Sequence, residues 1–491
     1  MASLQSSRMS IIDLDLVEDH ERHRAELASI QPDGRRRWIY ARMPRGWYTT
    51  LRRIVSIVLI AFLVLAPFVT VGGHQFILLN IITREFVLFG MPFWPNDFYL
   101  IALLFLTGVT TIVLFTATLG RIWCGWLCPQ TVFMEMVFRN IEWMIEGGPK
   151  EQALRRNGPW TWDRWWRAGV KVLLFAAISF GIANVFLSYV ISRDRLVMYI
   201  VDGPAAHLEL FGGLLFFTFV FFMVFYRFRE QACLIACPYG RYMSALVDEN
   251  TVAVTYDYKR GESRTKWSKA DSDARKHADE HGFTRPREAG DCVDCHQCVT
   301  VCPTGIDIRN GIQLECVNCT ACIDACDEVM DKVGLDRGLI RYSSLNAIEQ
   351  GTSRIFTRRI KAYLVVWVVF VAVVGVLFAM RSDLDVVLLR QPKSTWTTMA
   401  QGTANFYALN IINKTSQDLP YEIAVVSPSG YSITPLNLPT MVKAEQKMEG
   451  RLVIIRSSQA QRTGDETIRL EVRSRGAVLR TVETTFIGPQ E

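Results

Sequence analysis

A chain of 491 residues is long enough for two or three domains. Half of its residues are hydrophobic and the mean hydropathy is +0.16, values that favour membrane spans over a soluble enzyme. The net charge of +6 is modest, and Lys and Arg flank apolar runs, so the charge indicates orientation in a lipid membrane and not binding to nucleic acid.

The chain begins with a polar, charged stretch, residues 1–52, and no apolar run follows within the first thirty residues. We therefore expect no cleavable signal peptide. Five later stretches approach the ~20 residues that a helix needs to cross a bilayer. They are Arg53–Val71, Asp97–Gly120, Arg167–Val190, Leu210–Phe228 and Lys361–Met380. A further run from Phe76 to Trp94 contains Arg84 and Glu85, so we expect an interfacial or looped segment there.

Basic residues set the expected orientation. They gather before the first span, between residues 121 and 164, and on both sides of the stretch between the fourth and fifth spans. The positive-inside rule then places the N-terminus in the cytoplasm and the C-terminus outside. Residues 53–228 would hold four spans, 229–360 a cytoplasmic domain, 361–380 the fifth span and 381–491 an extracytoplasmic domain.

The two parts outside the membrane have different patterns. The polar stretch Lys259 to Glu288 is expected to be an exposed linker. In the last domain, Thr467 to Arg473 alternates apolar and charged side chains, and a turn at 474–476 leads to a partner strand, Ala477–Phe486. Further strand candidates are Phe406–Ile412, Glu422–Val426 and Arg451–Ile455. About a hundred residues of short strands predict a β-sandwich with a binding or docking role.

Eight of the twelve cysteines form two CxxCxxCxxxC runs, of which the first ends in Pro303. Such runs bind [4Fe–4S] clusters, and the fourth cysteine of each run ligates the other cluster. We therefore expect two clusters with crossed ligands. The first would be held by Cys292, Cys295, Cys298 and Cys326, and the second by Cys316, Cys319, Cys322 and Cys302. Structural zinc is the alternative, but two intact runs of this spacing favour clusters suited to electron transfer.

The other four cysteines form two CxxxCP motifs, Cys124/Cys128 and Cys233/Cys237, at the predicted cytoplasmic ends of the second and fourth spans. Cysteines at i and i+4 on a helix share one face. The four thiols are candidates for one copper site, two Cu(I) sites, a dithiol relay or a further cluster. Buried cysteines that act as small apolar residues are the alternative, although two matched pairs favour a functional, catalytic site.

Two histidines, His74 and His207, fall at the predicted extracytoplasmic boundary. They are candidate copper or haem ligands together with Met91 or Met198. A histidine alone at an interface is more often a capping or snorkelling residue.

The segments Gly120–Thr131, Cys237–Arg241, Asp291–Gly311 and Ala321–Lys332 resemble the FixG/RdxA/CcoG family of bacterial cytochrome c oxidase accessory proteins. The resemblance extends over nearly the whole chain. It implies five spans, a ferredoxin-like domain with two clusters and an immunoglobulin-like C-terminal domain, in the bacterial inner membrane with that last domain in the periplasm. It further implies reduction of Cu(II) to Cu(I) during assembly of cbb3-type oxidase, with copper as substrate or ligand of the CxxxCP cysteines.

Three functions therefore compete. The first is a cupric reductase that acts with oxidase assembly factors and copper chaperones or transporters. The second is an electron-transfer subunit that feeds a quinone or another membrane complex, and the third is a non-redox assembly scaffold. No GxGxxG fingerprint for a flavin or nicotinamide occurs, so we expect electrons from an unidentified donor.

Overall fold

The computed structural model describes residues 29–30, 33, 35–81, 85–268, 271, 289–313, 315–382, 384–391, 396–399, 401–415, 417–457, 464–474 and 476–489. The chain divides into two compact units. The first comprises residues 1–69, 77–83 and 98–373, and the second comprises residues 70–76, 84–97 and 374–491. Most of the stretch Lys259 to Glu288, predicted to be a linker, lies outside the described residues.

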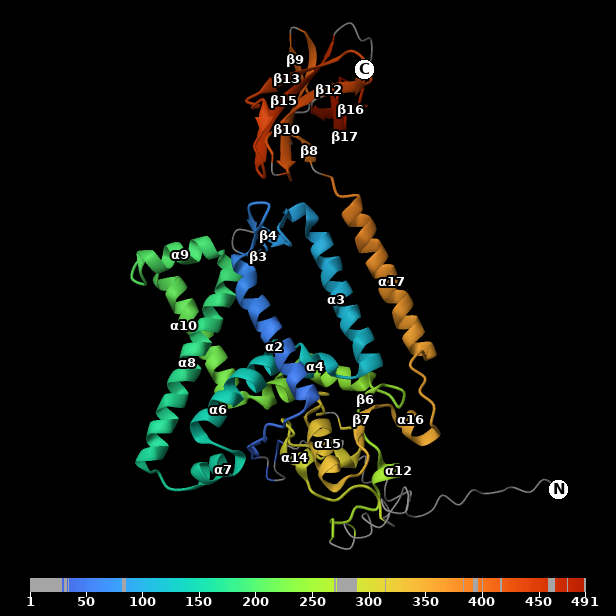
Figure 1. Ribbon diagram of the computed structural model, residues 1–491. Helices are drawn as coiled ribbons and strands as arrows, with labels where there is room; N and C mark the ends of the chain where they lie inside the picture. The colour runs from blue at the N-terminus through green and yellow to red at the C-terminus, as the bar shows by residue number, and fades with distance from the viewer. Residues whose placement is uncertain are drawn as a thin grey trace, which may run out of the picture. The chain divides into compact units, whose positions relative to one another are not determined.

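Five helical segments in the described residues are long and apolar enough to cross a membrane. Most of their side chains face outward, as expected for helices in lipid. The helices are α2 (Trp47–Leu65), α3 (Phe98–Leu119), α8 (Trp162–Ile191), α10 (Leu208–Met223, continued by the π-helical turn η4, Val224–Phe228) and α17 (Arg358–Ala379) (Figure 1). The five predicted spans are thus confirmed as apolar helices, and the chain is built as a multi-pass membrane protein.

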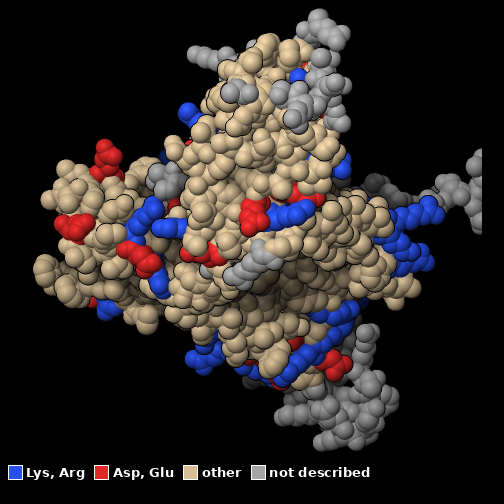
Figure 2. Space-filling model, turned by 90° about the horizontal axis from the view of Figure 1, so that it is seen from above, with Lys and Arg blue, Asp and Glu red and all other residues tan. Residues whose placement is uncertain are grey.

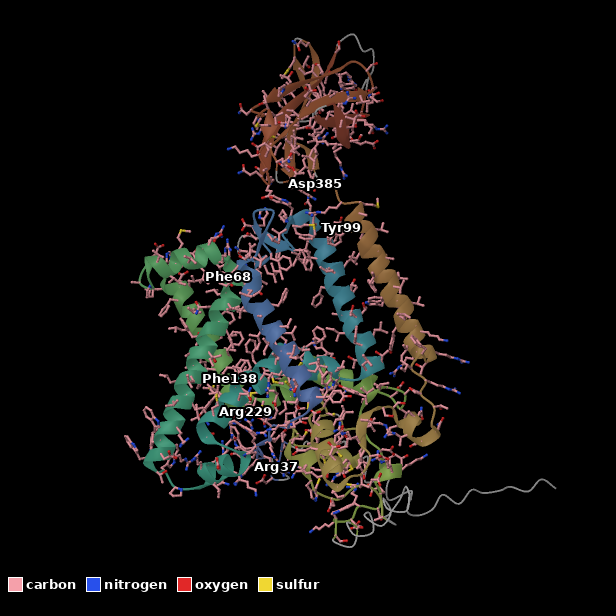
Figure 3. The ribbon with its side chains drawn as sticks, viewed as in Figure 1. Arg37, Phe68, Tyr99, Phe138, Arg229 and Asp385 are labelled. Atoms are coloured by element: carbon pink, nitrogen blue, oxygen red, sulfur yellow. The ribbon has the colours of Figure 1, made fainter. Side chains whose placement is uncertain are left out.

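A cluster of aromatic side chains packs α8 against the π-helical turns η3 (Phe133–Phe138) and η4. The ring of Phe138 lies in η3 and stacks on Phe225 with 4.4 Å between ring centroids. It also meets Phe175 of α8 at 4.7 Å. Just beyond this cluster, the buried Arg229 pairs with Glu142 of α6 (Arg139–Glu146). Figure 3 shows Phe138 and Arg229 close to each other in this part of the molecule.

The cysteine-rich domain belongs to the first unit and adjoins the N-terminal end of α2 (Figure 1). Its framework is a two-stranded antiparallel pair, β6 (Ala253–Tyr256) with β7 (Ile340–Ser343). The short helix α14 (Gln297–Thr300) lies within the first cysteine run and α15 (Ala321–Val333) within the second. Remaining elements of this unit are α7 (Pro149–Asn157), α9 (Arg193–Asp202), α12 (Tyr258–Gly261) and α16 (Leu345–Gln350).

The second unit contains the predicted β-domain. One sheet has the order β13-β15-β10-β8 and the other β12-β16-β17, all antiparallel. Their strands are β8 (Leu384–Arg390), β10 (Gly402–Asn413), β12 (Glu422–Ser427), β13 (Tyr431–Leu436), β15 (Lys447–Ser457), β16 (Glu466–Ser474) and β17 (Ala477–Phe486). A core that includes Tyr407, Leu452, Ile468 and Phe486 lies between the sheets. The strand predictions and the β16–β17 hairpin are confirmed, although Arg475 in the turn lies outside the described residues.

The segment between α2 and α3 adds short strands to the second unit. They include the pairs β1–β2 (Thr70–Val71 with His74–Gln75) and β4–β5 (Glu85–Leu88 with Met91–Phe93). Within this unit, the buried Asp97 forms two ion pairs. Its Oδ1 lies 2.7 Å from Lys414 Nζ, and its Oδ2 lies 3.1 Å from Arg381 Nη2. Seen from above, the surface is mostly uncharged, with charged side chains in small separate groups (Figure 2).

Candidate functional site: two thiol-lined cavities and a pair of CxxxCP turns

Two cavities in the cysteine-rich domain divide the eight cysteines in the crossed pattern. One, with an empty volume of about 330 Å³, is lined by Cys292, Cys295, Cys298 and Cys326. The other, of about 340 Å³, is lined by Cys302, Cys316, Cys319 and Cys322, with Cys298 at its edge. The sequence places Cys302 in the first run and Cys326 in the second, and each reaches the cavity of the other run. We call these cavity 1 and cavity 2.

The donor set fits an iron–sulfur cluster. All twelve cysteines are free thiols. Cavity 1 includes Cys326 from α15 of the second run, and cavity 2 includes Cys302 from the loop after α14 of the first run. Among the described residues, no three His, Cys, Asp or Glu side chains are placed to hold one metal ion. This finding is compatible with a cluster, because each cysteine of a [4Fe–4S] site binds a different iron.

Burial raises the pKa values of six of these thiols, those of Cys298, Cys302, Cys316, Cys319, Cys322 and Cys326. The pKa of Cys302 rises to about 11, and those of Cys298 and Cys316 rise to about 12. The pKa of Cys322 also lies well above its ordinary value because the side chain is buried among other thiols. Burial therefore favours the neutral form of these six thiols, and cluster binding would release their protons.

The two CxxxCP motifs have the same local structure. In the first, Cys124 lies in the short helix α4 (Ile122–Trp126) and Pro129 begins α5 (Pro129–Val132). In the second, Cys233 lies in the π-helical turn η5 (Ala232–Ala236) and Pro238 begins α11 (Pro238–Tyr242). Proline is well suited to the first position of a helix, and the residue before it is pushed into an extended conformation.

The second cysteine of each motif lies between two helices. Cys128 and Cys237 are extended, and each amide donates a 2.9 Å hydrogen bond to the carbonyl five residues earlier. The helical conformation therefore breaks before each proline. The i, i+4 arrangement on one continuous helix is wrong, because the chain leaves the helix before the second cysteine.

Arg121 lies where the two motifs meet. Its Nη2 is 3.9 Å from Cys124 Sγ, and a side chain at Gly240 would approach the same nitrogen within 3.2 Å. Burial raises the pKa of Cys233 to about 12, and the neighbouring Cys128 and Cys124 contribute to that rise. All four thiols of the two motifs interact electrostatically. The structure thus gathers them around one cation without forming a single-ion site.

The first CxxxCP turn packs directly on cavity 2. Cys124 shares a buried cluster with Val317 and Cys319, and Cys322 packs against it. A Cβ on Gly125 would lie 2.3 Å from the Val317 carbonyl oxygen and 3.0 Å from the Cys319 amide, so only glycine permits this approach.

Asn318 extends this contact. Its carbonyl accepts a 3.2 Å hydrogen bond from Trp126 Nε1, and its Nδ2 donates to the Leu119 carbonyl at 3.1 Å. These bonds join the end of α3 to the loop that carries Cys319.

The two candidate histidines each pair with a carboxylate. In the second unit His74 forms an ion pair with Glu445. In the first unit His207 Nε2 lies 3.2 Å from Asp202 Oδ2, and its ring packs on Tyr199 with 4.5 Å between centroids. The predicted ligand role therefore remains a prediction for both.

Three residues beside the site were not singled out from the sequence. They are Arg52, Gly125 and Asp324. Arg52 was interpreted only as a flanking basic residue before the first span. Its side chain is buried, which the charge pattern alone does not reveal.

Comparison with known proteins follows the same division of the chain. A family model described as "4Fe-4S dicluster domain" matches residues 228–345, and one described as "IG-like fold at C-terminal of FixG" matches residues 374–489. A third, "4Fe-4S binding domain", matches residues 101–146, whose cysteines are Cys124 and Cys128.

Three curated proteins are similar over most of the chain. Protein RdxA of Cereibacter sphaeroides is 35% identical, with 72% of this chain and 74% of RdxA covered. Protein RdxB of the same organism is also 35% identical, with 78% and 80% covered. The chain belongs to the FixG/RdxA family. Nitrogen fixation protein FixG of Rhizobium meliloti, a further member, is 34% identical, with 64% of this chain and 58% of FixG covered.

Membership in the FixG/RdxA family and the two 4Fe–4S matches make this chain an iron–sulfur electron-transfer protein. Among solved structures, a FixG-related protein from Vibrio parahaemolyticus matches 22% of this chain and 98% of its own, at 18% identity and a TM-score of 0.19.

Proposed function

We propose that this FixG/RdxA-family protein is a membrane-bound cupric reductase that supplies Cu(I) for assembly of cbb3-type cytochrome c oxidase. The observation that carries the proposal is the packing of Cys124 on Cys319 and Cys322. It places a thiol of the CxxxCP turns against the wall of cavity 2. Bound clusters would supply single electrons, and each Cu(II) that gains one electron becomes Cu(I).

The eight cysteines around cavities 1 and 2 are proposed to hold the clusters, in the crossed sets that line those cavities. The CxxxCP thiols are proposed to receive copper. Thiolates bind Cu(I) more strongly than Cu(II), so binding at these residues favours reduction. Cys124 is buried, whereas Cys128, Cys233 and Cys237 are partly exposed and accessible to an arriving ion.

Arg121 assists this chemistry. Burial raises the pKa of Cys124, and the neighbouring guanidinium of Arg121 opposes that rise. A cation at this position therefore favours the thiolate, the form of cysteine that binds a metal ion. The distance of 3.9 Å from Nη2 to Cys124 Sγ is consistent with this role.

The location is part of the proposal. We place the protein in the bacterial inner membrane, with the N-terminus and the cysteine-rich domain in the cytoplasm and the β-domain in the periplasm. Copper chaperones or transporters and oxidase assembly factors would be its partners, and a separate protein or small reductant its electron donor. Reporters fused after residues 282 and 380 should report opposite sides of the membrane, and the reverse assignment would contradict this orientation.

The experiment uses purified protein that has been chemically reduced without oxygen. It is mixed with Cu(II) or with a quinone analogue, while Cu(I) and cluster reoxidation are followed by absorbance. Rapid reoxidation by Cu(II) alone, with one Cu(I) formed per electron, supports cupric reduction. Reoxidation by the quinone alone favours electron transfer to a quinone, and no reoxidation favours a scaffold.

The double variant Cys124→Ser, Cys237→Ser tests the site. It should lose copper reduction but keep the iron of the two ferredoxin-type clusters. Gly108→Ala serves as a control and should keep the wild-type rate, because no atom lies within 4 Å of the added Cβ. Full copper reduction by the double variant would contradict the site, and a loss of about four irons per chain would indicate a further cluster at these cysteines.

A further inference from the structure

Arg52 is a buried cation beside cavity 2. It is only 7% exposed, and its Nε donates a 2.9 Å hydrogen bond to the Gly125 carbonyl. Its Nη2 is buried without a hydrogen-bond partner, and no Asp or Glu within the described ranges forms an ion pair with it. A buried charge is costly unless an opposite charge lies close by. The residues around Arg52 therefore leave a place for an anion.

The surroundings of Arg52 point to the second cluster as that anion. Gly125, which accepts its hydrogen bond, packs on the backbone of Val317 and Cys319. Arg52 also lines a cavity with Ala321, which lies between two cysteines of cavity 2. Burial raises the pKa of Cys319, and the charge of Arg52 opposes that rise.

The carboxylates near Arg52 are occupied elsewhere. Glu135 lines the same cavity but pairs with Arg139 at 2.9 Å. Asp324 accepts hydrogen bonds from the amides of Tyr48 and Thr49 at the start of α2. Arg121, near Cys124, is a second cation on the side of cavity 2 that contacts the first CxxxCP turn.

The cation that lines cavity 1 is, by contrast, paired with carboxylates. Arg309 lines this cavity and is almost fully buried. It pairs with two carboxylates, Asp307 and Asp294, at 2.6 Å each. A third carboxylate, Asp327, directly follows Cys326 and accepts a hydrogen bond from the Gly338 amide. Arg309 is therefore neutralised by its two carboxylate partners, unlike Arg52.

We propose that Arg52 is the counter-charge of the cluster in cavity 2 and raises its reduction potential above that of the cluster in cavity 1. An added electron makes a cluster more negative, and a nearby cation in a medium of low dielectric constant stabilises that form. The potential difference itself does not depend on the proposed function. Only its consequence does, namely that the more easily reduced cluster lies beside Cys124, where copper is proposed to bind. Arg52 is a tuning residue and does not bind copper.

The test measures both cluster midpoint potentials by electron paramagnetic resonance during redox titration of the purified full-length protein. Arg52→Met should lower one midpoint and leave the other unchanged. A tenfold shift in that reduction equilibrium, about 59 mV for one electron, is expected. Arg52→Lys should stay close to the wild type, because it retains the charge. Arg42→Met is the matched control, since Arg42 lines the same cavity but is exposed.

Two further variants identify the cluster that shifts. In a Cys295→Ser background, which disturbs cavity 1, Arg52→Met should still lower the remaining midpoint. Asp294→Asn should instead raise the midpoint of the cluster in cavity 1, because it removes a negative charge there. These measurements involve no copper, so a failed copper assay leaves them unaffected. Unchanged midpoints in Arg52→Met, or a shift confined to cavity 1, would overturn the proposal. If Arg52→Met does not fold, Arg52→Gln, which removes the charge but retains a hydrogen-bond donor, takes its place, and unchanged midpoints in that variant would overturn the proposal.

Discussion

Thr49 and Asp324 lie 275 residues apart and share a buried hydrogen bond of 2.6 Å from Thr49 Oγ1 to Asp324 Oδ2. The same carboxylate accepts the Thr49 amide at 2.6 Å and the Tyr48 amide at 3.2 Å. Asp324 of α15 therefore caps the N-terminus of α2, where a negative charge is favourable. One carboxylate fixes the cysteine-rich domain on the first apolar helix.

Replacing this carboxylate should weaken the attachment. Asp324→Ala leaves three buried donors without an acceptor, which costs about 1–3 kcal/mol. We expect a lower melting temperature of the purified protein, followed by tryptophan fluorescence, and partial loss of iron. Asp331→Ala is the control on the same helix, because Asp331 is exposed and its pair with Arg337 contributes little. Equal effects of both variants would contradict the capping role.

Crossed ligation predicts a pattern of iron loss in double variants. The intact protein should contain about eight irons per chain in these two clusters. Cys302→Ser combined with Cys316→Ser should lose no more iron than either change alone, because both line cavity 2. Cys302→Ser combined with Cys292→Ser should lose both clusters. The opposite pattern in iron analysis would show that each run holds its own cluster.

Gly125→Ala should separate the first CxxxCP turn from cavity 2. The new Cβ would meet the Val317 carbonyl at 2.3 Å, so the backbone must move. We expect a destabilisation of about 1–3 kcal/mol and a slower copper reduction. Gly108→Ala in α3 is the control, since no atom lies within 4 Å of its added Cβ. Wild-type stability and rate in Gly125→Ala would contradict the close contact.

The β-domain should lose stability at alkaline pH through Tyr431. Burial raises the pKa of Tyr431 to about 12, and the hydrogen bond from its hydroxyl to Glu466 adds to the rise. A raised pKa in the folded state gives a contribution that is fully present below the unfolded pKa of about 10. That contribution is lost as the pH rises toward 12. Hydrogen exchange of strand β13 in the intact protein should therefore accelerate over this range.

Tyr431→Phe is the variant that isolates this effect. It retains the edge contact with Phe486, at 5.1 Å between centroids, but cannot ionise. Its exchange rates should depend less on pH between 10 and 12 once the intrinsic base catalysis of exchange is subtracted. An identical pH dependence in both proteins would exclude Tyr431 as the group responsible.

Several features were predictable because they depend on residues close together in the chain. The five apolar helices follow from run length, and the β16–β17 hairpin follows from alternation at period two. The breaks before Pro129 and Pro238 follow from proline, which pushes the preceding residue into an extended conformation. The cysteine spacing also predicted the crossed sets that line cavities 1 and 2, because a fixed motif geometry determines which thiols reach which cluster.

Other features depend on residues that only the folded chain brings together. Gly125 and Val317 meet because α4 packs on the loop of the second cysteine run. Asp324 caps a helix that begins far earlier in the sequence. Arg52 resembled any basic residue that flanks a membrane span, yet it is buried beside Cys319. Sequence by itself determined the candidate cluster ligands and the apolar helices, through local spacing and composition. The tertiary structure decided which charges lie beside each cavity, because burial and electrostatic distance depend on packing between segments far apart in the chain.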